Sequence, residues 1–228
     1  MDIFDVVRFL AYLASPSVLG GMAIMFRPRL MLEAKAGKPG GFFREEVGLD
    51  IPAYILPQSQ SSYLATPAPS TPAETKGPRA VYLRALVYNS GWSFLARNCR
   101  VYVNRILFNG RDVGPARSQL KWKGGQKIDG PFTARDIARG KGRGFYVDLC
   151  ATDEVCAKFQ VKSSLEADGY KPFSGDGLYT LELSAEGSSS LCGTAFLSVD
   201  VRFSAKDLEK FEIVATKRLP WWKQIWRV

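Results

Sequence analysis

The sequence predicts a mainly β protein, an antiparallel β-sandwich preceded by an N-terminal transmembrane helix. From residue 80 onward, apolar and polar residues alternate with the period of two that is typical of half-buried strands. Gly, Asn and Asp turns separate these runs. Ahead of them, residues 9–26 form an apolar segment without a charge. At 228 residues, the chain is long enough for one or two domains.

The apolar segment 9–26 approaches the length of a membrane span, because a helix of roughly 20 residues crosses the hydrocarbon core. Pro16 and Gly20–Gly21 weaken a continuous helix, although membrane helices tolerate both residue types. Three alternatives stay open. We favour a single span over a hairpin or re-entrant segment turning at residues 15–17, and over a buried helix of a soluble domain.

Flanking charges predict the orientation of this span. Four basic residues follow it within residues 27–38, whereas Arg8 alone precedes it, beside Asp2 and Asp5. The positive-inside rule then places the C-terminal side in the cytoplasm. We therefore expect a single-pass membrane protein with a cytoplasmic C-terminal domain.

The clearest boundary in the chain is residues 57–78, whose five prolines and many Ser and Thr residues cannot build a core. We interpret this stretch as a tether. The predicted organisation is a membrane anchor (1–29), a juxtamembrane segment (30–56), a Pro/Ser/Thr-rich linker (57–78), a β-sandwich domain (79–216) and a Trp-rich basic tail (217–228).

Eight short runs are predicted to be strands, with turns such as Asn89-Ser-Gly91 between them. The runs are residues 81–89, 99–108, 119–122, 144–149, 157–161, 178–184, 195–203 and 211–214. Helical periodicity in this region is confined to the brief segment Ala205–Lys210. This pattern favours an antiparallel sandwich over a helical fold.

Two of these runs resemble a known family. Residues 83–91 (Leu-Arg-Ala-Leu-Val-Tyr-Asn-Ser-Gly) and 96–103 (Ala-Arg-Asn-Cys-Arg-Val-Tyr-Val) resemble the opening of immunoglobulin-like sandwich domains in bacterial membrane-anchored cell-envelope proteins. The resemblance covers about residues 80–203. It implies an immunoglobulin-like fold behind a membrane helix and names no ligand. The basic turn at 139–143 departs from the family pattern, in which a Pro-Gly turn is common.

The chain contains no histidine. This excludes histidine as a general acid or base, as the activator of a Ser or Cys nucleophile and as a metal ligand. We therefore expect a protein that is not an enzyme. The alternative is a hydrolase built on Asp148, Asp176 and Tyr179, but their spacing fixes no catalytic geometry.

The four cysteines show no metal-binding spacing. They are Cys99, Cys150, Cys156 and Cys192. No CxxC pair occurs, and the five residues between Cys150 and Cys156 are not a usual zinc spacing. We expect no metal, no cofactor and buried free thiols, with a Cys150–Cys156 bridge as the alternative in an oxidising compartment.

The net charge of +9 is concentrated in one stretch of the sequence. Residues 1–60 carry six basic and six acidic residues, whereas residues 92–145 carry twelve basic and three acidic ones. Such a stretch attracts anionic lipid, nucleic acid or an acidic partner. The alternative is an ordinary solvated surface.

A glycine-rich basic turn lies within this stretch, at Arg139-Gly-Lys-Gly-Arg-Gly144. A phosphate-binding loop follows a strand and opens a helix, but these glycines precede a strand. We predict a tight turn whose basic residues face an anionic surface. The predicted surface-binding residues are Arg135, Arg139, Lys141 and Arg143.

The C-terminal tail combines tryptophan with basic residues, the composition of an interfacial membrane segment. The predicted interface residues are Trp221, Trp222 and Trp226. The alternative is that the tail packs back on the sandwich. Trp122, between two lysines on a strand, is expected in the core.

Together these features favour a membrane-anchored, non-enzymatic binding or scaffolding protein. Its sandwich would face a protein partner or an anionic membrane surface. The alternative is a soluble nucleic-acid-binding module that uses residues 92–145.

Overall fold

The computed structural model describes the chain in ten stretches. They are residues 27–36, 43–48, 78–92, 95–114, 117–123, 130, 132–154, 157–164, 173–188 and 193–219. The predicted membrane segment 9–26, the linker up to residue 77 and the three tail tryptophans lie outside them. Within these stretches no helix has the length and apolarity needed to cross a membrane.

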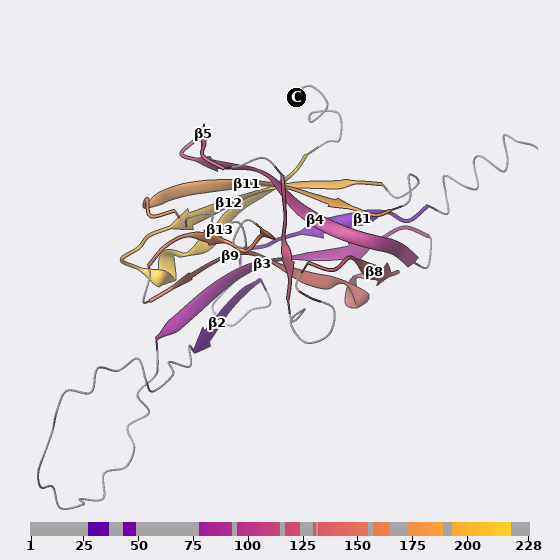
Figure 1. Ribbon diagram of the computed structural model, residues 1–228, viewed down its shortest axis with the longest axis horizontal. Coiled ribbons are helices and arrows are strands. Elements are labelled where there is room, and N and C mark those ends of the chain that lie inside the picture. Colours follow the sequence, from indigo (N-terminus) through magenta and orange to yellow (C-terminus); the bar gives the residue numbers. More distant parts are fainter. Residues whose placement is uncertain are drawn as a thin grey trace, which may run out of the picture.

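Antiparallel strands form two sheets, which Figure 1 shows as stacked layers. The first sheet contains β1 (Leu30–Glu33), β2 (Arg44–Gly48), β3 (Arg79–Asn89), β7 (Lys121–Trp122), β9 (Phe145–Asp153) and β10 (Gln160–Val161). β3 and β9 are its centre. β1 and β2 share one side of β3, and β7 and β10 share the far side of β9.

The second sheet follows the order β13-β12-β11-β4-β5, with β6 and β8 also paired to β4. Its strands are β4 (Leu95–Phe108), β5 (Arg111–Asp112), β6 (Ser118–Gln119), β8 (Arg135–Ala138), β11 (Gly177–Glu186), β12 (Ala195–Phe203) and β13 (Glu212–Arg218). Short 3-10 turns, η2 (Lys141–Arg143) and η4 (Leu208–Lys210), precede β9 and β13.

The core lies between the sheets. In β3, alternate residues Val81, Leu83, Ala85 and Val87 face inward and are almost fully buried. A cluster of aromatic rings closes one end of this core, where Tyr179 stacks on Phe159 with ring centroids 4.0 Å apart. Trp122 is fully buried, which confirms its predicted place in the core.

Each of the eight predicted runs overlaps a strand, so the prediction of a mainly β, antiparallel fold is confirmed. The run 119–122 is divided between β6 and β7, and only Gln160–Val161 of the run 157–161 is a strand. The brief helical pattern at Ala205–Lys210 corresponds to the 3-10 turn η4. Sequence patterning missed four strands: β1, β2, β5 and β8. All four have five residues or fewer, which is too short for a clear alternation.

Two of the missed strands change the domain organisation. β1 and β2 precede the Pro-rich stretch, yet both pair with β3, and Gly48 at the end of β2 is the register partner of Arg79 at the start of β3. The stretch between them thus joins neighbouring strands of one sheet. The sheets therefore include residues outside the predicted range 79–216, and the 57–78 stretch does not tether a separate domain.

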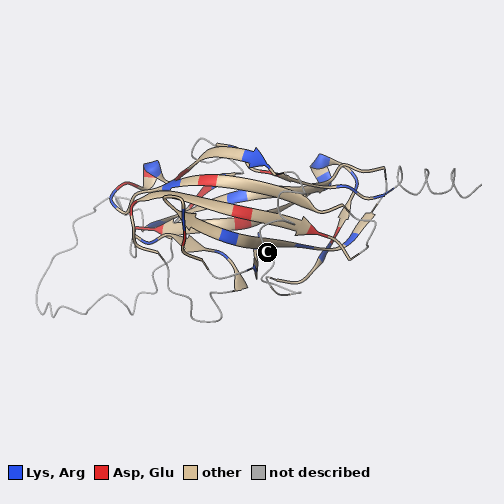
Figure 2. Cartoon of the chain, turned by 90° about the horizontal axis from the view of Figure 1, so that it is seen from above, with Lys and Arg blue, Asp and Glu red and all other residues tan. Residues whose placement is uncertain are grey.

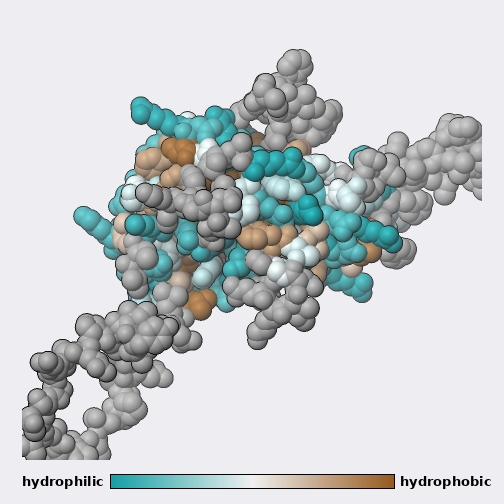
Figure 3. Space-filling model, in the orientation of Figure 1, coloured by the Kyte–Doolittle hydropathy of each residue, from teal (hydrophilic) through white to brown (hydrophobic). Residues whose placement is uncertain are grey.

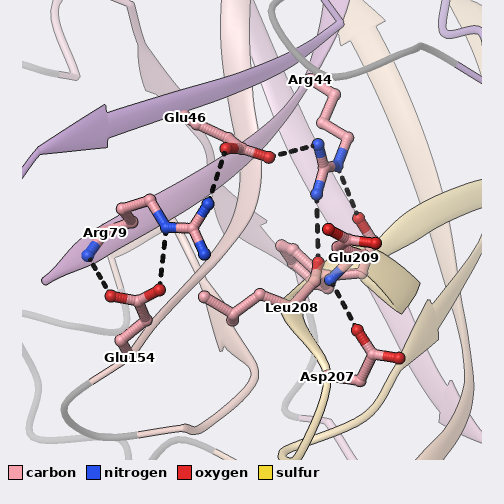
Figure 4. A network of polar contacts seen from close by, with 8 residues as sticks. Arg44, Glu46, Arg79, Glu154, Asp207, Leu208 and Glu209 are labelled. Atoms are coloured by element: carbon pink, nitrogen blue, oxygen red, sulfur yellow. Dashed lines mark hydrogen bonds and ion pairs between the residues drawn. The ribbon is translucent and has the colours of Figure 1, made fainter. Parts of the chain in front are cut away.

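Hydrogen bonds from the side chain of Arg44 connect the two sheets (Figure 4). Its side chain, on β2, is buried and donates from Nε to the carbonyl of Phe211 and from Nη2 to that of Leu208, each at 3.1 Å. Its Nη1 pairs with Glu46 at 2.6 Å. A strand of the first sheet thus holds the connection between β12 and β13 in the second.

Candidate functional site

The side chain of Asn89 organises one end of the sandwich. Asn89 is fully buried at the end of β3, and its Oδ1 accepts hydrogen bonds from the backbone N–H groups of Arg29 and Gly91, at 3.1 and 3.0 Å. Its carbonyl accepts another from the N–H of Gly140, at 2.9 Å. One residue thereby brings the start of β1, the end of β3 and the predicted basic turn together.

The turn is built as the glycine pattern predicts. Gly140 has φ +107°, a conformation that favours glycine, and Lys141–Arg143 form one 3-10 turn before β9. At Gly144, a Cβ would lie 2.6 Å from the carbonyl oxygen of Val87. A glycine there lets the turn pack directly on β3. This geometry confirms a tight turn before a strand.

Three of the four predicted surface-binding residues lie on this turn. Arg139, Lys141 and Arg143 are all exposed. Lys141 pairs with Glu33 of β1 at 2.7 Å, and this hydrogen bond raises the pKa of Lys141 and lowers the pKa of Glu33. Lys141 therefore also attaches the turn to β1.

An exposed tryptophan, which the sequence analysis did not single out, accompanies these residues. Trp92 is 63% exposed, and the Arg139 guanidinium lies over its ring at 5.2 Å. Arg27 and Arg29 are also exposed. They lie near Trp92, because a Cβ on the preceding residue, Gly91, would lie only 2.5 Å from the carbonyl oxygen of Arg27. We call Arg27, Arg29, Trp92, Arg139, Lys141 and Arg143 the basic end. The sequence signal for Trp92 was its position directly after the predicted turn Asn89-Ser-Gly91.

Arg135 does not belong to this group. It starts β8, about 13 Å along the strand from Arg139 at 3.3 Å per residue. Its guanidinium lies 5.0 Å from the ring centroid of Phe145 and 5.9 Å from that of Trp122. Arg135 is partly buried and covers core aromatic rings.

The basic stretch of residues 92–145 is not one continuous surface. Lys121 lies on the first sheet, whereas Arg105 lies on the second. Arg105 pairs with Asp112 at 2.6 Å, and Arg117 pairs with Glu186 at 2.5 Å. Blue and red ribbon segments are accordingly mixed over both layers in Figure 2.

One flank of the sandwich is open. Thr216 and Arg218 of β13 are the register partners of Val199 and Leu197, and partners on adjacent strands share a face. Val199 and Leu197 are buried in the core, yet Thr216 and Arg218 are exposed. The inward face of β13 thus lies uncovered at this point, beside β1, the edge of the opposite sheet.

A groove runs between β1 and this overhang. Its larger part has a volume of about 680 Å³, and a neighbouring part beside it has about 360 Å³. Arginines 27, 29 and 218 line the larger part together with apolar residues, and its described lining contains no acidic residue. The apolar lining residues are Leu30, Met31, Leu32, Ala195, Phe196 and Leu219. Elsewhere, on the face in Figure 3, hydrophobic residues form small, separate patches.

The residues weighed for hydrolysis have structural contacts. Asp148 is buried and accepts from Nε of Arg84 at 2.7 Å. Asp176 accepts from the backbone N–H of Ala205 at 2.8 Å. The hydroxyl of Tyr179 donates to the carbonyl of Gly175, and burial raises the pKa of Tyr179 to about 12.

Cysteines and carboxylates form no metal site in the described part of the chain, where no three such residues are grouped. Cys99 and Cys150 are buried free thiols, as expected. Burial raises the pKa of Cys150 well above its ordinary value, and the charge of Asp148 raises it further. Cys156 and Cys192 lie outside the described residues.

Comparison of the chain with protein-family models, curated proteins and solved structures gives no match.

Proposed function

We propose that this protein is a non-enzymatic binding module held at an anionic membrane surface, with its basic end against the lipid. The observation that carries the proposal is the composition of that end. The Arg139 guanidinium lies over the exposed Trp92, and the neighbouring Gly91 lies against the backbone of Arg27, the residue that follows the predicted membrane segment 9–26. Tryptophan and basic residues together are favoured at the membrane interface.

The two ends of the chain support the same placement. Arg27, which follows the N-terminal segment, and Leu219, the last described residue of the Trp-rich tail, line the same groove. The predicted anchor and the predicted interfacial tail would therefore start from one region of the sandwich. A cytoplasmic sandwich on a single-pass anchor agrees with this arrangement.

The strand order supports the finer, immunoglobulin-like assignment. β1-β3-β9-β7 corresponds to the order A-B-E-D of such domains, and β12-β11-β4 corresponds to G-F-C. β13 would be an additional strand beyond G. Domains of this architecture serve many unrelated functions, so the binding role rests on the basic end.

Hydrogen exchange of the full chain in lipid nanodiscs tests the proposal. Anionic lipid in place of zwitterionic lipid should slow exchange in residues 88–92 and 139–144. The triple variant Arg139→Glu, Lys141→Glu, Arg143→Glu should abolish this slowing, because each basic residue near an anionic surface strengthens association about fivefold.

The matched control reverses three exposed charges at the opposite end of the sandwich, Arg111→Glu, Lys206→Glu and Lys210→Glu. It changes the net charge equally and should retain the slowing. Equal behaviour of the two triple variants, or no effect of lipid charge on the wild-type chain, would reject the proposal.

A further inference from the structure

We infer that the groove between β1 and β13 binds an acidic, extended segment of a partner protein, which adds a strand to the free edge of β1. The inference deepens the proposed function, since it names the kind of partner that the membrane-held sandwich would take. It rests on three features of the groove: a strand edge that is paired only at its start, an uncovered sheet face and a one-sided charge.

The first feature is the edge of β1. The carbonyl of Arg29 accepts from the N–H of Ser90, next to β3, and residues two apart on a strand direct their backbone groups to the same side. The backbone groups of Met31 and Glu33 therefore face β3, while those of Leu30 and Leu32 face the groove. Gly193 already pairs at the start of this edge, where its N–H donates to the carbonyl of Pro28 at 3.3 Å and it forms a parallel bridge with Arg29. The open part of the edge therefore begins after the N–H of Leu30 and continues along Leu32. Among the described residues, β3 is the one strand paired with β1.

The second feature is the overhang of β13. The first sheet ends at β1, which packs against β11 and β12 of the second sheet. A strand added to β1 would lie over the exposed inward face of Thr216 and Arg218. The first sheet would then have one more strand at this edge, and that strand would cover the exposed inward face of β13.

The third feature is the charge. Arg27, Arg29 and Arg218 line the larger part of the groove, and Lys35 lines the neighbouring part. The described lining contains one carboxylate, that of Glu33, and it is already paired with Lys35 at 3.0 Å and with Lys141 at 2.7 Å. A guest strand with carboxylates complements this charge, whereas the rest of the tail, residues 220–228 with Lys223 and Arg227, does not.

These features together specify the partner sequence. Backbone pairing with β1 supplies affinity, and alternate side chains supply specificity. Residues over Leu197 are expected to be β-branched or small, because the floor is apolar and closely packed. Residues that approach Arg29 and Arg218 are expected to be Glu or Asp.

The test uses the full chain in uncharged detergent micelles, so that no anionic lipid is present. The probe is a fluorescent nine-residue peptide with glutamates at both ends and valine and threonine between them. Anisotropy should show saturable binding. The same peptide with lysine for every glutamate, and one with proline at its central residue, should each bind at least about tenfold more weakly, because they lose charge complementarity and strand pairing respectively.

Arg218→Glu should weaken binding at least about tenfold, because it reverses a charge that faces the groove. Lys217→Glu is the matched control on the same strand, since Lys217 is the register partner of Ser198 on the opposite face. Lys217→Glu should leave binding within about twofold of the wild type. Equal losses in both variants would show a general charge effect and would overturn the inference.

Hydrogen exchange of the wild-type chain provides a second readout that needs no variant. The glutamate peptide should slow exchange in residues 28–35. Protection of these residues without peptide, combined with no peptide binding, would mean that a segment of this chain already covers β1. Undiminished binding of the proline peptide would mean that the groove takes an anion rather than a strand. Either result overturns the inference.

Discussion

The buried charged residues in the described part of this sandwich have partners that explain their position. Arg84 of β3 is 4% exposed and pairs with Asp148 of β9 and with Glu45 of β2. Breaking a buried pair by removing one partner is costly, because a charge is left without compensation. Asp148 therefore stabilises the first sheet through its pair with Arg84, whatever the protein binds.

Tyr179 gives a prediction at the residue scale. Its ring is buried in the aromatic cluster, and its pKa is raised from 10.0 to about 12. A group with a raised pKa in the folded state contributes stability that is present below pH 10 and is lost as the pH rises through 12. The shift of two units corresponds to about 2–3 kcal/mol.

Urea unfolding of the wild-type chain and of Tyr179→Phe, between pH 8 and pH 12, measures this contribution. The variant lacks the hydrogen bond to Gly175 and should be the less stable protein at pH 8. The difference in unfolding free energy should shift by about 2 kcal/mol in favour of the variant toward pH 12, because only the wild type has to keep this hydroxyl protonated. A gap independent of pH would contradict the assignment.

Sequence reasoning placed single residues correctly where one local rule decides their position. Trp122 is buried as expected of a tryptophan in a strand, and the turn at 139–144 follows from its glycines. Arg135 shows the limit of this reasoning. Its place over Phe145 depends on how β8 packs across the sandwich, which no local pattern contains.

At the scale of elements, the missed strands were β1 and β2 of the first sheet and β5 and β8 of the second. β2 has the sequence Arg-Glu-Glu-Val-Gly, and the residue that it directs into the protein is Arg44. An inward arginine reverses the usual pattern, in which charges on a strand face solvent. The contacts of Arg44 with Phe211 and Leu208, some 165 residues away, explain this arrangement.

The Arg44 contacts give a prediction for the joint between the sheets. Arg44→Met should destabilise the full chain by about 2–4 kcal/mol, because two carbonyls and Glu46 lose a buried partner. Arg79→Met is the matched control from the same network. Its exposed side chain pairs with Glu46 and Glu154, and exposed pairs contribute little.

Urea denaturation followed by circular dichroism compares the two variants. The midpoint should fall clearly for Arg44→Met and stay near that of the wild type for Arg79→Met. If both midpoints fell equally, the network would act through its surface pairs rather than through the contacts of Arg44 with the second sheet.

At the scale of the whole molecule, the basic end and the aromatic cluster lie at opposite ends of β4. β4 alone has fourteen residues and spans roughly 45 Å, from Leu95 near the basic end to Phe108 near the aromatic cluster. Charges are screened within about 8 Å in physiological salt. The basic end can therefore face a membrane while the opposite end, which carries β5, stays in solvent (Figure 1).

The connection between β2 and β3 joins two paired strands, so the segments before and after it belong to one folding unit. Compositional reasoning placed a domain boundary at residues 57–78, because Pro, Ser and Thr cannot form a core. The composition of residues 57–78 does not show that the strands before and after them, β2 and β3, are neighbours in one sheet. Leu30, Leu32, Ala34 and Arg44 are buried in the sandwich, so the part of the chain before the insertion contributes to its core.

Cleaving the chain within this connection tests that organisation. With a site-specific protease site in place of residues 64–70, the two fragments should remain associated after cleavage, because β1 and β2 stay paired with β3. Size-exclusion chromatography in uncharged detergent should show one complex, which dissociates only in denaturant. Release of the N-terminal fragment under native conditions would instead mean that residues 79–219 hold together without β1 and β2, as the compositional boundary predicts.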